Sequence, residues 1–314
     1  MEDRKHPEKL IETVVNEIKK AIIGKDEVVL KMILSIISGG HILIEDVPGV
    51  GKTTLATALC SALSLSFKRI QFTPDVMASD VTGYNVYNRK KCEFEFIEGA
   101  VFANIVLADE LNRTSGKTQS ALLEAMEEEA VTIDGITRPL PHPFTVIAAQ
   151  NPSGTVGTAF LPESQLDRFM VCLTLGYPEK SDEISILKRK PNVKTSVRQV
   201  LSIDDLNFLR QAASQIYVDD KIYDYIAEIA KKTRESDILS LGLSPRGSLA
   251  LASMARATAL AKGRSFVLPE DVLYIWEDVV RHRVVLSPKA ERKFSGRVSG
   301  AIAEIVMSVP VPAL

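Results

Sequence analysis

The chain has 314 residues and 46% of them are hydrophobic, which is enough to bury the core of one or two ordinary domains. Lys and Arg number 38 against 40 Asp and Glu, so the formal net charge is −2 and the basic excess typical of nucleic-acid-binding proteins is absent. The three cysteines lie far apart, predict neither a disulfide framework nor a zinc site, and fit a reducing cytoplasm: Cys60, Cys92 and Cys172.

The N-terminal residues are polar. The first ten, MEDRKHPEKL, lack the apolar run of a secretory signal. The most apolar stretch of the chain, residues 28–47, is interrupted by Lys31, His41, Glu45 and Asp46, so it does not predict a membrane span. We therefore expect a cytoplasmic protein without membrane insertion.

Helices and strands alternate through the first half of the chain. Apolar spacing predicts an amphipathic helix over 8–21 and a second helix around 26–37. The short apolar run HILIED then opens a series of strand-like runs, at 41–46, 67–73, 104–110, 144–150 and 169–175. Helical patterns separate several of them, notably at 52–63 and 116–129. Continuous apolar strands in such an alternation predict a parallel sheet covered by helices on both faces.

Two segments interrupt this alternation. Residues 84–97 alternate around a charged tip, and residues 130–139 alternate around Asp134-Gly135. Asp-Gly between such runs is typical of a tight β-hairpin turn. Both hairpins could be ordinary surface features, and both could carry function.

The strand pattern stops after Tyr177-Pro178. Helical faces follow at 222–229 and 272–279, with an Ala-rich helix near 247–261. We therefore predict two domains, an α/β core over 1–178 and an all-helical domain over 179–314.

A phosphate-binding loop is predicted where the first strand ends. HILIED leads into VPGVGKTT and then an Ala/Leu-rich helix. Glycines let the backbone N–H groups point at an anion, and the helix N-terminus adds partial positive charge. Lys52 is expected to reach the β- and γ-phosphates of ATP, and the Thr53 hydroxyl to ligate Mg²⁺. The predicted nucleotide-binding residues of the loop are Gly49, Val50, Gly51, Lys52, Thr53 and Thr54.

One position departs from the strict phosphate-loop pattern, because Asp46 stands where the pattern has its first glycine. The remaining P-G-x-G-K-T core is intact. A Gly-Lys-Thr string is common by chance, but its place between a predicted strand and a predicted helix favours the phosphate loop.

Two acids follow the apolar run NIVLA. Asp109 and Glu110 would lie at the carboxyl edge of the sheet, where open α/β sheets bind ligands. Asp109 is expected to hold Mg²⁺, mostly through water, and Glu110 to polarise the attacking water. The pattern alone also fits a solvated strand end. After a phosphate loop it indicates ATP hydrolysis.

Three further polar residues are candidates for the same chemistry. Asn151 follows the strand FTVIAAQ and could bind the lytic water or the γ-phosphate, although Asn-Pro is also ordinary turn chemistry. Arg168 precedes the last strand and Arg246 opens a helix of the second domain. Isolated arginines are usually solvated or ion-paired, so these two need context.

Taken together, these strings resemble the MoxR family of AAA+ ATPases, in its helix-2-insert branch. The resemblance covers about residues 10 to 310 and rests on LIEDVPGVGKTT, RIQFTPDVMASDVTG, IEGAVFANIVLADELNRTSGKTQSALLEAMEE, VIAAQNP, LPESQLDRF, LSPRG and VVRHRV.

The resemblance implies a fold and a set of roles. The fold is an αβα core with a parallel five-stranded sheet of order 5-1-4-3-2, followed by a helical lid. The hairpins match the helix-2 insert and the pre-sensor hairpin, which line the opening of a ring. Asn151 matches sensor 1, Arg246 matches sensor 2, and Arg168 matches the arginine finger given to a neighbour. Ile22 and Ile23 match the segment that packs on adenine.

The resemblance also implies a cellular role. It predicts a homo-oligomer, a hexameric ring, that acts as an ATP-driven, chaperone-like factor on other protein complexes beside a von Willebrand factor A domain partner. One alternative is a nucleotide-gated scaffold that scarcely needs hydrolysis, but Glu110 argues against it. Another is a DNA motor, which the acidic balance disfavours.

Overall fold

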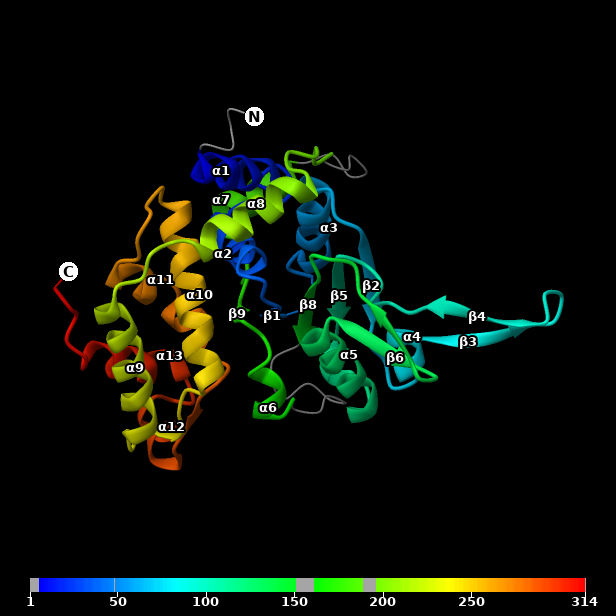
Figure 1. Cartoon of the computed structure of the whole chain (residues 1–314). Helices are drawn as coiled ribbons and strands as arrows, with labels where there is room; N and C mark the ends of the chain where they lie inside the picture. The colour runs from blue at the N-terminus through cyan, green and yellow to red at the C-terminus, as the bar shows by residue number, and fades with distance from the viewer. Residues whose placement is uncertain (1–5, 48, 151–160, 189–195, 314) are drawn as a thin grey trace.

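Five parallel strands form the central sheet of the computed structural model, which describes residues 6–47, 49–150, 161–188 and 196–313 (Figure 1). They are β1 (Ile42–Glu45), β2 (Phe67–Gln71), β5 (Ile105–Asp109), β8 (Thr145–Gln150) and β9 (Val171–Leu173). Their order is β2-β5-β8-β1-β9. When these strands are numbered along the chain this is the predicted order 5-1-4-3-2, which is therefore confirmed.

Each face of the sheet packs on its own apolar core, because successive strand residues point to opposite sides. Ile42 and Ile44 of β1 belong to the core formed with α1 (Pro7–Ile18), α2 (Asp26–Ile37) and α3 (Lys52–Leu63). Leu43 belongs to the opposite core, which α5 (Gly116–Glu128) covers. The continuous apolar runs of the sequence thus correspond to strands buried on both faces.

Both predicted hairpins are present. β3 (Gly83–Asn88) pairs with β4 (Glu93–Glu98) directly after the short helix α4 (Ala78–Thr82), and β6 (Ala130–Ile133) pairs with β7 (Ile136–Pro139). Asp134 and Gly135 have φ of 50° and 78°, the positive values that a tight hairpin turn needs. Asn85 Nδ2 donates to Asp134 Oδ2 at 2.6 Å, which joins the two hairpins. β3–β4 extends away from the body of the molecule (Figure 1).

The described residues of the C-terminal part are mainly helical, and they include a short ladder of β10 (Leu239–Leu241) with β11 (Val285–Leu286). The short helices between the strands are η2 (Leu111–Arg113) and α6 (Glu163–Leu166). The C-terminal helices are α7 (Lys180–Leu187), α8 (Ile203–Ser214), α9 (Asp220–Glu235), α10 (Pro245–Ala261), α11 (Pro269–Val280), α12 (Pro288–Lys293) and α13 (Val298–Met307).

The C-terminal helices share a core with the N-terminal ones. Leu251 and Met254 of α10 belong to the same buried cluster as Val14 of α1 and Met32 of α2. The division into 1–178 and 179–314 stays a prediction, since one apolar core crosses it. None of the described helices combines the length and the apolarity that crossing a bilayer requires.

Candidate functional site

The predicted phosphate loop lies between the carboxyl end of β1 and the first turn of α3. Gly49 and Gly51 have φ of 87° and 99°, values that a side chain disfavours. Gly51 is the N-cap of α3, so Lys52 and Thr53 begin the helix. This placement puts unpaired helix N–H groups and the positive end of the helix dipole at the loop, as anion binding requires.

Lys52 is held inside the loop. Its residue is only 8% exposed, and its Nζ donates to the backbone carbonyl of Asp46 at 2.9 Å. Burial lowers the pKa of Lys52, while the nearby charges of Asp109, Asp46 and Glu110 oppose that shift. The structure thus brings the predicted phosphate-binding cation to the two predicted acids, although Lys52 and Asp109 are far apart in sequence.

Asp46, the departure from the glycine pattern, has a structural role. Its side chain is buried, and Oδ1 accepts the backbone N–H of Val47 at 2.8 Å. Oδ2 accepts the backbone N–H of Gly176 at 2.7 Å, just beyond β9. A carboxylate at this position therefore ties the start of the loop to the neighbouring strand, a contact that glycine could not make.

Asp109 and Glu110 lie where β5 ends, at the same edge of the sheet. Arg69 of β2 donates from Nη2 to Asp109 Oδ2 at 2.7 Å. Glu110 has a left-handed backbone, with φ of 57°, and its Oε2 accepts from Arg113 Nη1 at 2.8 Å. Both acids are therefore ion-paired with arginines that the sequence analysis did not single out.

The residues at this edge fit an ATP·Mg²⁺ complex. Thr53 and Asp109 offer the oxygen ligands that Mg²⁺ prefers when phosphates supply the others. Ile22 is buried beside the loop, since a methyl on Gly51 would lie 3.6 Å from its Cδ1. Among the other predicted contacts, Ile23 and Val50 are half-buried and Thr54 is exposed.

Asn151 lies outside the described residues. The residue before it, Gln150, ends β8 between β1 and β5, and its Nε2 donates to Glu45 Oε1 at 3.2 Å. The role proposed for Asn151 stays a prediction.

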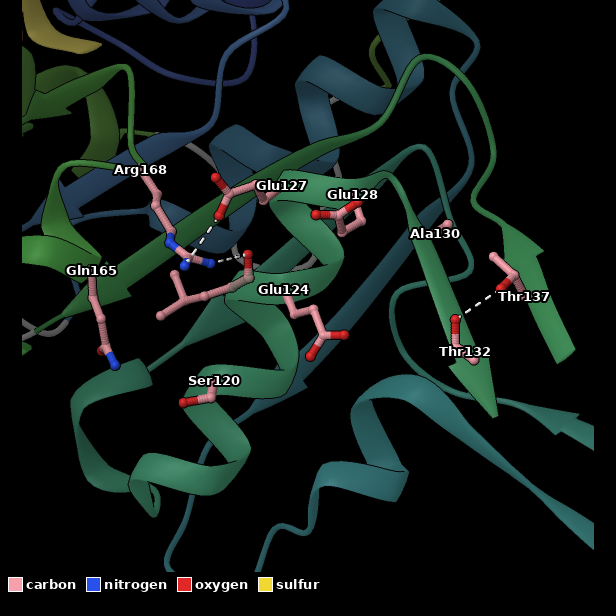
Figure 2. A pocket seen from close by; sticks show the side chains of 10 residues that line it. Ser120, Glu124, Glu127, Glu128, Ala130, Thr132, Thr137, Gln165 and Arg168 are labelled. Carbon is pink, nitrogen blue, oxygen red and sulfur yellow. Dashed lines mark hydrogen bonds and ion pairs between the residues drawn. The ribbon is translucent and has the colours of Figure 1, made fainter. Parts of the chain in front are cut away.

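Arg168 lies at the amino edge of the sheet, where the parallel strands begin. It sits in the turn between α6 and β9, before that parallel strand begins. Its Nη1 donates to the carbonyl of Leu123 at 2.7 Å, and its Nη2 lies 3.1 Å from Glu127 Oε2 (Figure 2). Leu123 and Glu127 belong to the C-terminal half of α5. Arg168 is thus separated from the phosphate loop of its own chain by the length of the strands.

Arg246 lies beside Arg168. It is in the first turn of α10, and its Nη2 lies 2.5 Å from Glu127 Oε1. One carboxylate therefore binds both arginines. The hydrogen bond from Arg246, and then the charge of Arg168, lower the pKa of Glu127. The structure brings Arg246 to Arg168, because α10 begins at the edge of the sheet away from the loop. Its match to sensor 2 stays a prediction.

Two cavities flank this cluster. A cavity of about 650 Å³ opens over α5 and the β6–β7 hairpin, with Arg168, Glu127, Glu124 and Gln165 in its wall (Figure 2). A second cavity of about 340 Å³ has both Arg168 and Arg246 in its wall, together with Gly39, Gly40 and His41, which precede β1. Both arginines therefore border open space at the amino edge of the sheet.

Sequence reasoning missed the partners of the predicted residues. Glu127 stands in a run of acids that is typical of a solvated helix face, and Arg69 lies within a predicted strand. Arg283 Nε also donates to Asp167 Oδ1 at 2.9 Å. These two residues lie in the strings VVRHRV and LDRF, and no local pattern marks them as partners. Their pairings join distant segments, so spacing alone could not reveal them.

Comparison with known proteins agrees with this architecture. Residues 41–171 match the family described as "ATPase family associated with various cellular activities (AAA)", and residues 231–302 match "AAA lid domain". The chain is 46% identical to the uncharacterized protein YeaC of Bacillus subtilis (strain 168), over 98% of this chain and 96% of that protein.

Two further relatives carry more informative names. Chaperone MoxR1 of Mycobacterium tuberculosis is 40% identical over 88% of this chain and 76% of its own length. A crystal structure from Cytophaga hutchinsonii, of a protein assigned as an ATPase, superposes with a TM-score of 0.91 at 36% identity, covering 99% of this chain and 98% of that one. With these relatives and this sheet order, the chain belongs to the MoxR family of AAA+ ATPases.

Proposed function

We propose that the chain binds ATP with Mg²⁺ at the loop between β1 and α3 and hydrolyses it. The supporting observation is the gathering of a buried lysine and two strand-end acids at one edge of the sheet. Bound Mg²⁺ would neutralise charge on the phosphate oxygens, and Thr53 and Asp109 would hold it. Lys52 would bind the β- and γ-phosphates, and Glu110 would orient and polarise the attacking water.

Nucleotide binding would exchange contacts that the chain now makes with itself. The Nζ of Lys52 donates to the Asp46 carbonyl, and phosphate oxygens offer it a stronger, charged acceptor. Arg69 and Arg113 occupy the carboxylates of Asp109 and Glu110. Each acid would leave its arginine to take up its role.

We also propose that the active site is completed by a neighbouring subunit. Arg168 and Arg246 border cavities at the amino edge of the sheet, while the phosphate loop lies at the carboxyl edge. Neither arginine serves its own loop in this arrangement, but a head-to-tail neighbour could receive both. Contacts of that type close into rings when the rotation between subunits permits, and a hexamer is the ring that the family resemblance implies.

The work done by hydrolysis would be the remodelling or maturation of another protein complex. The β3–β4 hairpin supports a contact role, since Tyr84, Tyr87 and Phe94 expose their side chains along it and Arg89 and Lys90 are exposed at its tip. The resemblance implies that a protein with a von Willebrand factor A domain is the partner in this work. A nucleotide-gated scaffold is the competing function, and the two differ in whether complex assembly requires hydrolysis.

The test is Glu110→Gln, which keeps the size of the side chain and removes its charge. We expect ATP affinity near wild type and loss of turnover, measured by titration calorimetry and phosphate release. Glu12→Gln makes the same chemical change on the exposed side of α1 and should behave as wild type. Turnover near wild type in Glu110→Gln would remove Glu110 from the catalytic role.

The same variant can identify the client. With ATP held in place, complexes that normally dissociate after hydrolysis should accumulate, and mass spectrometry of co-purifying proteins would name them. If the remodelling cycle is dispensable and the protein is a scaffold, Glu110→Gln should support complex assembly in the cell as well as wild type does.

A second test separates a shared site from a self-contained one. Arg168→Ala subunits and Lys52→Ala subunits should each be inactive alone. When mixed, some interfaces pair an intact loop with an intact arginine, and activity should partly return. With subunit exchange verified by a labelled chain, no recovery at any ratio would contradict the arrangement in trans.

A further inference from the structure

A buried arginine of the C-terminal region holds the turn that carries Arg168. The Arg283 side chain is 1% exposed, and its Nε donates to Asp167 Oδ1 at 2.9 Å. Its Nη1 donates to the carbonyl of Met170 at 3.0 Å, and its Nη2 donates to the carbonyls of Asp167, at 3.3 Å, and Phe169. One guanidinium therefore binds residues on both sides of Arg168 in the chain.

Asp167 connects the same turn to the helix that carries Arg246. Its Oδ1 also accepts the hydroxyl of Ser244 at 2.8 Å. Ser244 is the N-cap of α10 and accepts the backbone N–H of Gly247 at 3.0 Å. The carboxylate of Asp167 is thus the junction between the turn before β9 and the first turn of α10.

The chemistry of this junction favours a fixed geometry. Burial lowers the pKa of Arg283 to about 10, and the charge of Asp167 opposes that shift, so the guanidinium stays charged at neutral pH with its donors paired. A planar guanidinium binds several oxygens in a rigid arrangement, which lysine cannot reproduce. The contact therefore restrains orientation as well as distance.

From these contacts we infer that Asp167 and Arg283 are positioning residues, which hold Arg168 and Arg246 as one unit for the nucleotide of the neighbouring subunit. The two arginines bind the two oxygens of Glu127, so the structure already presents them with a common spacing. A phosphate entering from the neighbour would meet both together. A movement of α10 would move Arg168 with Arg246, because Ser244 and Asp167 join their supports.

This inference rests on the proposed in-trans site, and its experiment uses full-length protein. Asp167→Ala removes the acceptor for Arg283 and Ser244. We expect kcat to fall about 10²-fold, as displacement of a positioned group by about 1 Å can cost, with far less change in the KM for ATP. Asp167→Asn keeps the acceptor oxygen and should recover part of the lost kcat.

Mixing then distinguishes positioning from a general folding defect. Asp167→Ala subunits keep an intact phosphate loop, so Lys52→Ala subunits, which bring intact arginines, should restore activity. Arg168→Ala subunits should not restore it, because neither partner then supplies a well-placed finger. The control is Asp271→Ala, which removes a more deeply buried carboxylate, paired with Lys262 and Arg264, in the first turn of α11. Asp271→Ala should lower the thermal stability of the protein. At temperatures below its melting temperature, its kcat should equal that of wild type.

Each result decides the inference. Unchanged kcat in folded Asp167→Ala and Asp167→Asn would overturn it, as would recovery of Asp167→Ala by Arg168→Ala subunits. If Asp167→Ala does not fold, Asp167→Asn undergoes the same mixing and is judged in the same way. Failure of the Arg168→Ala and Lys52→Ala mixture, with exchange verified, would instead refute the in-trans site itself.

Discussion

The two edges of the central sheet hold their charged side chains in different ways. At the carboxyl edge, Lys52, Asp109 and Glu110 all come from segments directly attached to strands β1 and β5. At the amino edge, Glu127 binds Arg168 and Arg246, which belong to a turn before β9 and to a C-terminal helix. The first group is fixed by strand ends. The second depends on how the C-terminal region packs on the core.

This difference suggests a division of labour. A site made of strand ends keeps its geometry as long as the sheet is intact, which suits binding of the nucleotide. A cluster that joins the core to the C-terminal helices changes when those helices move, which suits a response to nucleotide state. ATP affinity should therefore depend mainly on the carboxyl edge, whereas turnover should need both edges, since Glu110 lies at the carboxyl edge and Arg168 at the amino edge.

The largest expected effect is at the carboxyl edge. Lys52→Ala removes the only side-chain cation of the loop, so ATP binding and hydrolysis should both be lost. Titration calorimetry measures the binding. Lys68→Ala, which removes a lysine of β2 that donates to the Gly99 carbonyl, is the control and should bind ATP normally. Full-affinity binding by Lys52→Ala would mean that the loop is not the nucleotide site.

Arg168→Ala tests the amino edge. Removal of an arginine finger typically costs about 10³-fold or more in kcat, whereas Lys52 and Mg²⁺ would still hold the nucleotide. We therefore expect a large fall in kcat with nearly unchanged affinity for ATP. A loss of affinity as severe as that of Lys52→Ala would erase the distinction between the two edges. Arg198→Ala, in a segment that donates its backbone N–H to Glu17, removes an arginine outside both clusters and should keep kcat.

The β3–β4 hairpin belongs to neither edge and gives a smaller effect on ATPase. Residues 89–92 form its exposed turn, where Asn88 Oδ1 accepts the N–H of Lys90 at 3.0 Å. Replacing 88–91 with a short Gly-containing turn should spare basal ATPase and weaken action on a client. Replacing Asp134-Gly135 with Asn-Gly keeps the other hairpin turn and serves as control. Loss of folding on trimming would instead assign the hairpin a structural role.

Much of the carboxyl edge could be predicted from the sequence because its signals are local. The loop is one continuous string, and Asp109 follows the apolar run that becomes β5. The strand order, by contrast, is predicted by the family resemblance. Apolar runs show which segments are strands, but not which strands lie next to one another in the sheet. The outcome for Asn151 stays open, because it lies outside the described residues.

The amino edge could not be predicted in the same way. Arg246 and Glu127 are 119 positions apart, and nothing in either surrounding segment marks the other as a partner. The same holds for Asp167 and Arg283, whose pairing depends on where α11 ends against β9. The family resemblance indicated a catalytic role for Arg168 and Arg246. Only tertiary packing shows which carboxylates hold them, and that packing places Arg246 away from its own loop.

The smallest expected effect concerns stability at the amino edge. His41 precedes β1 and is buried, with its Nδ1 accepting the N–H of Val146 at 3.0 Å and its Nε2 placed 3.0 Å from the carbonyl of Met126. Burial lowers the pKa of His41 from its usual 6.5 to about 4. Between about pH 4 and pH 6.5 the ring is therefore neutral in the folded protein but protonated in the unfolded chain.

The sign of the pH dependence follows from that difference. Above about pH 6.5 His41 is neutral in both states, and below that value the unfolded chain binds the additional proton, so stability falls as the pH falls toward 4. Between pH 7 and pH 5 the free energy of unfolding should fall by roughly 2 kcal/mol because of this residue.

Urea unfolding of wild type and His41→Gln at both pH values measures this loss. His41→Gln should be less stable at pH 7 and lose less on acidification, while His142→Gln, at an exposed histidine, keeps His41 and the steeper loss. Equal losses in wild type and His41→Gln would show that His41 is not the residue that couples the amino edge to pH.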